Sequence, residues 1–515
     1  METKKQTTTK TTKKKSTAKK TDTKSEVKVT KKTSKLPKIT VSKKKKIVFL
    51  GSEAAPFIAT GGLADVLGSL PKALAKDKKL DISVILPLYS NINQSFREKM
   101  EFITNFNVSV SWRLQYAGVF KCVHENVTFY FIDNEYYFKR EGNIYGFYDD
   151  AERYAFYSRA ALDTIARLDI FPDVLHCNDW QSAAAIVYLK GMYYGDERFR
   201  NIKSVFTIHN IEYQGAFGME TYGDLFGFPE SVKNFVEHNG MVNLMKAAVE
   251  MTDLVTTVSP TYSQEIKHEF FAHGLDSVIR RNEHKLTGIL NGIDLDYYNP
   301  ETDKCLFKNY SVKDLSGKAV CKAELQKMLG LPERADVPVI SVISRLVSHK
   351  GLDLVKGVIE QILAQDVQLI ILGKGEVGYE NFFTNVAKNY PTKCIAIIAY
   401  NQDLSRKIYS GSDLFLMPSK MEPCGLSQMI AGRYGTVSIV RETGGLNDSI
   451  HFYDGQNGNG FTFHDYNAHD MLHVINIACN VFRDKNAWKD VQNRILNSDF
   501  SWNNLAGKYL ELYNK

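Results

Sequence analysis

Short runs of apolar residues alternate along this chain with longer stretches whose apolar residues recur at helical spacing. In the first half, the runs cover residues 46–50, 82–87, 128–132, 174–177, 204–208 and 254–258. Stretches such as 63–74 and 154–168 lie between them and favour helices. Nearly continuous apolar runs separated by helices indicate parallel strands that are buried on both faces. The pattern predicts an α/β unit with helices on both faces of a mostly parallel sheet.

The same alternation begins again in the second half, with apolar runs at residues 337–343, 367–372, 394–398, 414–417 and 437–440. A chain of 515 residues is too long for one core, so two α/β domains are expected. Residues 288–294 lie between the two patterns and predict a hinge strand and turn. The chain from residue 467 onward reads as helical, and Trp488 and Trp502 are candidates to anchor it on the body.

A glycine turn follows the first strand. Residues 60–63 read Thr-Gly-Gly-Leu and open a helix, and the same four residues recur once in the second half at 443–446. Glycine permits a tight turn and close approach of a ligand, and a helix N-terminus attracts phosphate. One such turn alone is best explained as packing in an α/β domain. Two copies, one per unit, favour two nucleotide-type domains that face a shared cleft.

Charged residues gather at the predicted strand ends. Arg345 and Lys350 follow one predicted strand. Glu422, which is 77 residues further along the chain than Arg345, follows a different predicted strand. Arginine forks onto phosphate oxygens and lysine adds a point charge, whereas a carboxylate suits sugar hydroxyls or a developing positive charge. Singly, each residue is explained equally well as a solvated surface charge or a helix-capping carboxylate. Together at strand ends they indicate a site, because parallel sheets bind ligands there.

The basic character of the chain lies in its first residues. Residues 1–46 contain eighteen lysines and three acidic residues, a net charge of +15 that leaves −8 for the rest of a chain whose total is +7. A tail so poor in large apolar residues predicts disorder over residues 1–45. It matches no secretory signal. A polyanion tether is one interpretation, and a solvated extension without a catalytic role is the preferred one. We expect neither nucleic acid nor a membrane as a partner.

Several other site types are excluded or disfavoured by spacing. Residues 373–378 match G-x-G-x-x-G, but no acidic residue follows about twenty positions later, which argues against NAD. His268 and His273 are one residue too far apart for an H-E-x-x-H zinc motif, and no phosphate-binding P-loop motif is present. Seven scattered cysteines lack metal-ligand pairing and predict a reducing, cytoplasmic setting.

Seven motifs in order give the chain its resemblance to the bacterial glycogen synthases and plant starch synthases. They lie at residues 60–66 (TGGLADV), 178–180 (NDW), 207–215 (TIHNI with YQG), 288–294 (GILNGID), 344–351 (SRL with KG), 422–426 (EPCGL) and 443–446 (TGGL). The resemblance runs from about residue 46 to the C-terminus. It implies the GT-B fold, with Rossmann-like domains at 46–287 and 301–485, a hinge at 288–300 and a C-terminal helix at 486–515 that returns to the first domain.

The resemblance also implies a reaction and the residues that perform it. The family moves glucose from a nucleotide sugar, here expected to be ADP-glucose, onto an α-1,4-glucan with retention of configuration and without a metal or other cofactor. Arg345 and Lys350 would hold the donor diphosphate, and Glu422 would bind glucose hydroxyls. Asp179 and His209 would contact the sugar from the first domain. The other implied donor-binding residues are Gly61, Gly62, Asn291, Tyr400, Cys424, Gly425, Leu426, Thr443, Gly444 and Gly445.

Two positions depart from the family pattern. Ala59 stands where many members have lysine before the first glycine turn, and Gln181 stands where many have histidine. The loss of one cation could weaken donor affinity or change nucleotide preference. Two alternatives therefore stay open: a related transferase that uses UDP-glucose, sucrose or a small acceptor, and a glucan-binding homologue without turnover. The sequence does not specify the oligomeric state.

Overall fold

A nine-stranded sheet organises the first half of the folded chain. The computed structural model describes Thr12 and residues 44–515. Within the sheet the strands follow the order β12-β11-β7-β6-β1-β2-β5-β4-β3. All neighbours from β12 to β5 are parallel, whereas β4 and β3 are antiparallel. The strands are β1 (Lys45–Leu50), β2 (Leu80–Pro87), β3 (Glu101–Val110), β4 (Arg113–His124), β5 (Val127–Asp133), β6 (Val174–Asn178), β7 (Lys203–Ile208), β11 (Leu254–Thr257) and β12 (Leu286–Gly288).

Helices cover this sheet, and a small three-stranded sheet lies beside it. Helix α5 is apolar nearly all round, so residues 181–189 are all buried between the sheet and neighbouring helices. The small sheet is formed by β8 (Ala216–Gly218), β9 (Glu237–His238) and β10 (Met241–Asn243). The helices are α1 (Gly62–Leu74), α2 (Gln94–Arg97), α3 (Glu135–Phe138), α4 (Asp150–Arg167), α5 (Trp180–Gly191), α6 (Glu197–Arg200), α7 (Lys233–Val236), α8 (Leu244–Met251), α9 (Pro260–Glu265), α10 (Glu269–Ala272) and α11 (Asp276–Arg281).

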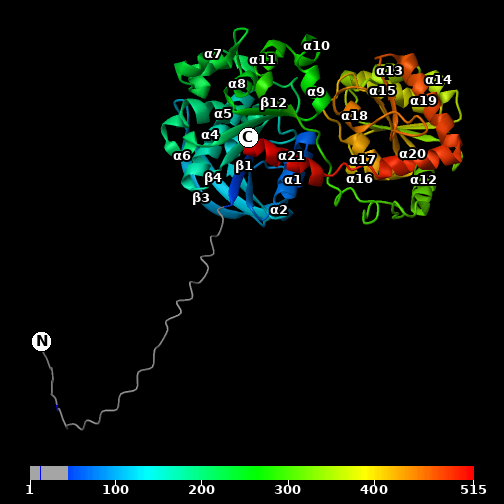
Figure 1. Ribbon diagram of the computed structural model, residues 1–515, viewed down its shortest axis with the longest axis horizontal. Helices are drawn as coiled ribbons and strands as arrows, with labels where there is room; N and C mark the ends of the chain where they lie inside the picture. Colours follow the sequence, from blue (N-terminus) through cyan, green and yellow to red (C-terminus); the bar gives the residue numbers. More distant parts are fainter. Residues whose placement is uncertain (1–11, 13–43) are drawn as a thin grey trace, which may run out of the picture. The chain divides into compact units, whose positions relative to one another are not determined.

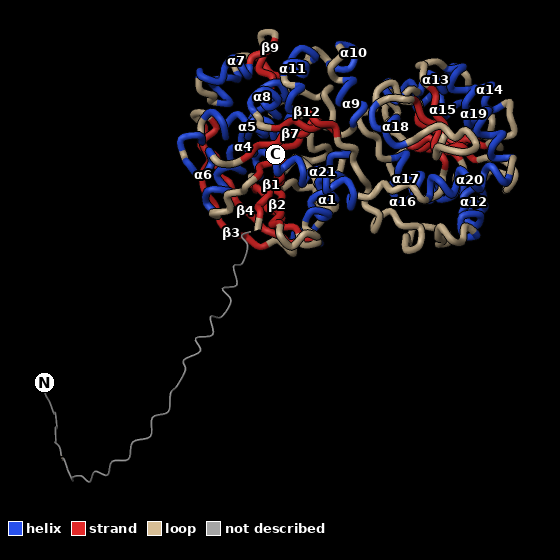
Figure 2. Tube along the Cα trace, viewed as in Figure 1, coloured by secondary structure: helices blue, strands red, loops and turns tan. Residues whose placement is uncertain are grey.

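A six-stranded sheet, parallel throughout, organises the second half. Its order is β15-β14-β13-β16-β17-β18. The strands are β13 (Val339–Ile343), β14 (Gln368–Gly373), β15 (Cys394–Ile398), β16 (Leu414–Met417), β17 (Val437–Arg441) and β18 (Phe461–Phe463). The helices are α12 (Ser316–Leu329), α13 (Leu352–Gly357), α14 (Ile359–Leu363), α15 (Val377–Asn389), α16 (Gln402–Gly411), α17 (Ser427–Arg433), α18 (Gly444–Ser449), α19 (Ala468–Arg483), α20 (Lys485–Leu496) and α21 (Trp502–Asn514). Figure 2 shows the strands of the two sheets as separate groups.

We call elements β1 to β12 together with α21 the first lobe, and α12 to α20 the second lobe. The chain passes between the lobes twice, and the two crossings pair with each other: the Ile293 amide donates to the Phe500 carbonyl (2.9 Å), and Ile293 forms a β-bridge with Ser501. Helix α20 packs on α17, whereas α21 packs on α1 (Figure 1). The Tyr513 hydroxyl at the end of α21 bonds His176 Nδ1 in β6 (2.8 Å), so the end of the chain completes the first lobe.

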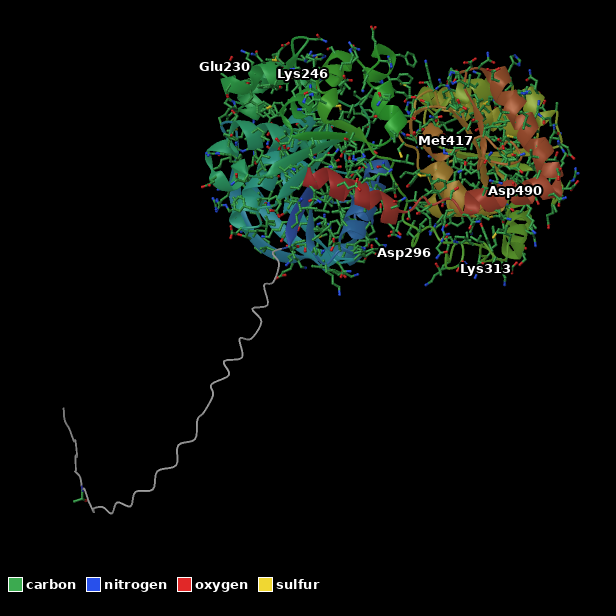
Figure 3. All side chains as sticks on the ribbon, viewed as in Figure 1. Glu230, Lys246, Asp296, Lys313, Met417 and Asp490 are labelled. Carbon is green, nitrogen blue, oxygen red and sulfur yellow. The ribbon has the colours of Figure 1, made fainter. Side chains whose placement is uncertain are left out.

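The predicted strands of both halves are present, and the two-lobe α/β architecture is confirmed. Strands β15 and β16 begin and end where the apolar runs do. The antiparallel hairpin β3–β4 was missed because it is an edge with one solvent-exposed face, so its pattern alternates instead of forming an apolar run. Side chains fill both lobes, and Met417, at the end of β16, lies in the second (Figure 3).

The N-terminal boundary falls at the predicted tail. Strand β1 begins at Lys45, and the remainder of the predicted tail, apart from Thr12 and Lys44, lies outside the described residues. Among the residues that the structure describes, no helix combines the length and apolar character needed to span a bilayer.

Candidate functional site

The glycine turn after β1 faces the second lobe. Gly61 and Gly62 are exposed, and a Cβ atom on Gly62 would lie 3.7 Å from Leu426 Cδ1 in the loop before α17. Gly61 has an extended backbone (φ −164°) that any residue can adopt, so a glycine here leaves room beside the turn and is not required by the backbone conformation. The turn is held from behind by Glu53, whose Oε2 accepts bonds from the Thr60 amide (2.5 Å) and hydroxyl (2.8 Å).

Glu53 is buried, and it is not among the site residues predicted from the sequence. Burial raises the pKa of its carboxyl to about 7, although the two bonds from Thr60 oppose the rise. A carboxylate in a buried stretch just after a parallel strand was a usable signal, because such positions lie at the ligand-binding edge of the sheet.

Asp179 and His209 lie at the ends of β6 and β7, as predicted for strand-end residues. Asp179 adopts φ +55° at the start of α5 and accepts the His209 amide (2.8 Å). Burial raises the pKa of Asp179 to about 7 and lowers the pKa of His209 to about 3, so the imidazole is neutral at pH 7. The structure brings these two residues together.

The tautomer of His209 follows from its neighbour. The Asn178 side-chain amide donates to the carbonyls of Leu50 (3.0 Å) and His176 (3.2 Å), so its Oδ1 is the acceptor that faces His209 Nε2 (2.9 Å). Nε2 therefore carries the proton and Nδ1 is left as an acceptor. Since His209 is partly exposed, this acceptor suits a ligand hydroxyl.

Lys350 and Glu422 form a partly buried ion pair at the strand ends of the second lobe. Lys350 Nζ lies 2.5 Å from Glu422 Oε2, and the Ser419 hydroxyl donates to the same oxygen (3.0 Å). Glu422 is only 7% exposed, so it requires these partners. Ser419 is a second contributor that was not predicted from the sequence, and its side chain is buried.

Close backbone packing fixes the loop that carries Lys350. Gly351 adopts φ +71°, and a Cβ atom there would lie 1.8 Å from the Pro418 carbonyl oxygen. Arg345 follows β13 and, unlike Glu422, is exposed. Within residues 44–515 its guanidinium group takes part in no hydrogen bond or ion pair, so it is available to an anion.

The second Thr-Gly-Gly turn packs directly on the Glu422 loop. A Cβ atom on Gly444 (φ +45°) would lie 1.9 Å from the Glu422 carbonyl oxygen, and the Gly445 amide donates to the Pro423 carbonyl (3.1 Å). The donors of this turn are engaged by the first lobe: Glu265 Oε1 accepts from the Thr443 hydroxyl (2.9 Å) and the Gly444 amide (3.0 Å). No sequence signal pointed to Glu265, because it reads as an ordinary helix-surface acid.

The remaining predicted residues differ in placement. Asn291 is buried, and within residues 44–515 its Oδ1 has no hydrogen-bond partner. Burial raises the pKa of the neighbouring Cys424 thiol to about 12. Gly425 (φ +71°) shapes the loop between Cys424 and Leu426. Tyr400 follows β15 and is 83% exposed, so its ring is open to a ligand.

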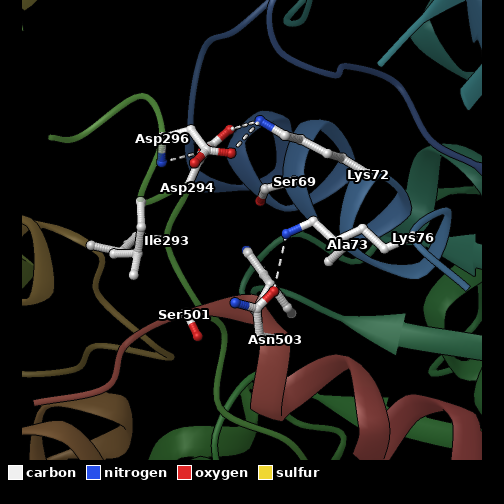
Figure 4. A pocket seen from close by; sticks show the side chains of 11 residues that line it. Ser69, Lys72, Ala73, Lys76, Ile293, Asp294, Asp296, Ser501 and Asn503 are labelled. Atoms are coloured by element: carbon white, nitrogen blue, oxygen red, sulfur yellow. Dashed lines mark hydrogen bonds and ion pairs between the residues drawn. The ribbon is translucent and has the colours of Figure 1, made fainter. Parts of the chain in front are cut away.

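No metal-ligand cluster accompanies these residues. In the described part of the chain, no group of three or more His, Cys, Asp and Glu side chains is arranged to hold a metal ion. A small cavity of about 60 Å³ lies away from the ion pair, between α1 and the crossings (Figure 4). There Lys72 Nζ contacts Asp294 (2.9 Å) and Asp296 (3.3 Å) of the linker.

The two α/β lobes, each built on a largely parallel sheet, have the architecture of the GT-B class of glycosyltransferases. Residues 46–281 match the family described as "Starch synthase catalytic domain", and residues 327–486 match "Glycosyl transferases group 1". A glycogen synthase of Clostridium novyi is 47% identical over 473 residues, which cover 91% of this chain and 98% of the relative. The chain belongs to the glycogen synthase and starch synthase family.

Further relatives agree. A glycogen synthase of Bacillus cereus is 46% identical over 471 residues, covering 91% of this chain and 98% of that protein. The catalytic domain of starch synthase IV from Arabidopsis thaliana, bound to ADP and acarbose, superimposes with a TM-score of 0.86 at 33% identity and covers 92% of this chain and 99% of its own. A sucrose-phosphate synthase from Thermosynechococcus elongatus, at 16% identity and a TM-score of 0.58 over 92% of this chain and 98% of its own, shares the fold.

Proposed function

We propose that this protein transfers glucose from ADP-glucose to the non-reducing end of an α-1,4-glucan with retention of configuration. The observation that carries the proposal is the buried Lys350–Glu422 pair beside the exposed Arg345, with the Gly61–Gly62 turn against Leu426. Support comes from the glycogen synthases that match nearly the full folded chain and from the starch synthase bound to ADP and acarbose.

In the proposed reaction, Arg345 and Lys350 neutralise the departing diphosphate. The bond from glucose C1 to the phosphate oxygen breaks, and a bond from C1 to the acceptor O4 forms on the same face. The acceptor hydroxyl proton passes to the departing phosphate oxygen, so no other base is needed. Glu422 binds glucose hydroxyls, and neutral His209 accepts a sugar hydroxyl through Nδ1. Fixed charges of this kind contribute roughly 10²–10³ each in rate.

The other proposed contacts are backbone and cleft contacts. Gly61 and Gly62 provide close approach to the donor, and Asp179 holds the His209 amide in place. Asn291 lines the cleft and offers its Oδ1, which has no partner among the residues that the structure describes. Tyr400 flanks the base, and the loop at residues 424–426 completes the donor site. Thr443 and Gly444, which donate to Glu265, support the Glu422 loop from behind.

The test is glucosyl transfer to glycogen from ADP-glucose and UDP-glucose in parallel, with and without EDTA. Arg345→Ala and Glu422→Gln are compared with Lys388→Ala, which replaces an exposed lysine of α15. We expect turnover from ADP-glucose that survives EDTA, falls about 10²–10³-fold in the two site variants and is unchanged in the control. Turnover only from UDP-glucose would reassign the donor. Glucan binding without turnover from either donor would replace the enzyme assignment with a binding protein.

Ala59 provides a second test, because it is exposed beside the glycine turn and a lysine has room there. We expect Ala59→Lys to lower the KM for ADP-glucose about tenfold with kcat little changed, since a charge-assisted bond to phosphate contributes about 1.5–3 kcal/mol. Ala59→Gln, which has a long side chain without charge, is the matched control. An unchanged KM would mean that position 59 lies away from the donor phosphates.

A further inference from the structure

Two short helices of different lobes cap each other. Asp448, near the end of α18, accepts from the Ser259 hydroxyl (2.6 Å) and from the Thr261 amide (3.0 Å) and hydroxyl (2.7 Å) at the start of α9. Glu265, the last residue of α9, accepts in return from Thr443 and Gly444 at the start of α18. We call these six residues the α9–α18 clasp; the two helices are side by side in Figure 1.

The charges of the clasp depend on the partner lobe. Neither Glu265 nor Asp448 pairs with Lys or Arg within 4.0 Å in the described residues, and the hydrogen-bond partners of both are hydroxyl and amide groups across the lobe boundary. Each carboxylate also lies at the positive end of the opposite helix. When the lobes separate, both sides return to water, so the clasp is a reversible contact and not part of either core.

The clasp touches the loops that carry the proposed site on both sides. In the second lobe, Gly444 packs on the carbonyl of Glu422, as described above. In the first lobe, the Tyr262 hydroxyl of α9 accepts the amide of Ile211 (3.2 Å), two residues after His209. The Ser259 hydroxyl also accepts the Tyr262 amide (2.8 Å), so the group that binds Asp448 is joined to the tyrosine that holds the His209 loop.

We propose that Glu265 and Asp448 are positioning residues that hold the two lobes in the alignment required for donor binding, without touching the donor themselves. They set the distance between the His209 loop and the Glu422 loop. The proposal rests on the proposed function for its activity readout alone, because lobe alignment and ADP binding are measured independently of turnover.

The experiment compares Glu265→Gln, Asp448→Asn and the double variant with Glu269→Gln, an exposed neighbouring acid of α10 as control. We expect each single variant to raise the KM for ADP-glucose and the Kd for ADP about tenfold while kcat stays within about twofold. The double variant should have about the same KM and Kd as the single variant that binds more weakly, because both carboxylates serve one contact. Small-angle scattering should show a larger radius of gyration for the variants without nucleotide and compaction toward wild type at saturating ADP.

Thr261 separates a positioning role from a purely structural one. Thr261→Val removes a hydroxyl donor to Asp448 and should reproduce the rise in KM. Thr261→Ser keeps this donor and should have the KM of wild type. Unchanged KM, ADP affinity and scattering in folded Glu265→Gln and Asp448→Asn would overturn the proposal. If wild type shows no turnover, the proposed function fails, but ADP affinity and scattering still decide the role of the clasp.

Discussion

The Lys350–Glu422 pair places two charges where water has little access. Such a pair contributes modestly as a whole, but breaking it leaves one buried charge uncompensated. We expect Lys350→Met to reduce the free energy of unfolding by about 3 kcal/mol, because Glu422 then retains only the Ser419 hydroxyl. Adding Glu422→Gln should recover most of that loss. Urea unfolding measures both, and equal stability of the single and double variants would contradict the argument.

Glu53 predicts a pH dependence of stability. Its folded pKa of about 7 lies above the unfolded value near 4.3, so the folded state binds more protons between these limits. The contribution of this group to stability is therefore complete below about pH 4 and is lost as pH rises through 7.

Glu53→Gln mimics the protonated group and should remove that dependence. Wild type should lose stability between pH 5 and pH 7.5 and the variant should not, so the difference in free energy of unfolding between them should grow by about 1–3 kcal/mol. This follows from about 1.4 kcal/mol per pH unit for one titrating group. Urea unfolding at the two pH values gives the difference. Parallel pH profiles of the two proteins would show that Glu53 is ionised throughout.

At the scale of elements, the turn after Lys350 requires glycine at position 351, because a side chain there has no room. Gly351→Ala combines a left-handed backbone with a clash against the Pro418 carbonyl, whereas Gly330, at the end of α12, has a similar φ (+72°) and open space. We expect Gly330→Ala to cost about 1 kcal/mol with full activity. Gly351→Ala should cost several kcal/mol more and displace Lys350 from Glu422.

Thermal unfolding and glucosyl transfer, measured on both glycine variants, test the comparison. Loss of activity confined to Gly351→Ala is the expected result. Equal effects of the two substitutions would mean that backbone conformation, and not the contact with Pro418, controls this turn.

At the scale of the whole molecule, the last helix stabilises the lobe in which the chain began. We propose domains at residues 46–287 and 301–485, with 288–300 as the hinge between them. Tyr513→Phe removes the hydrogen-bond partner of Nδ1 of buried His176 and should cost about 1–3 kcal/mol. Faster amide exchange should appear in β6 and β7 but not in the six-stranded sheet. Glu511→Gln, an exposed change on the same helix, is the control, and uniform exchange across both lobes would contradict the assignment.

The sequence by itself determined most strands of the two parallel sheets, the two-lobe α/β class and, through seven motifs, the family. These properties are local: a short apolar run bounded by turn residues favours a buried strand, and a motif is read from adjacent residues. Arg345, Lys350 and Glu422 were identified in this way. The edge hairpin β3–β4 was missed because exposure of one face weakens its apolar signal.

Only the tertiary structure decided which distant groups meet. Glu265 and Thr443 are 178 residues apart, and His176 and Tyr513 are 337 apart. Such pairs have no periodicity or spacing, since they depend on how whole lobes pack after their cores have closed. The same packing buried Glu53 and so raised its pKa, which its position in the sequence could not reveal.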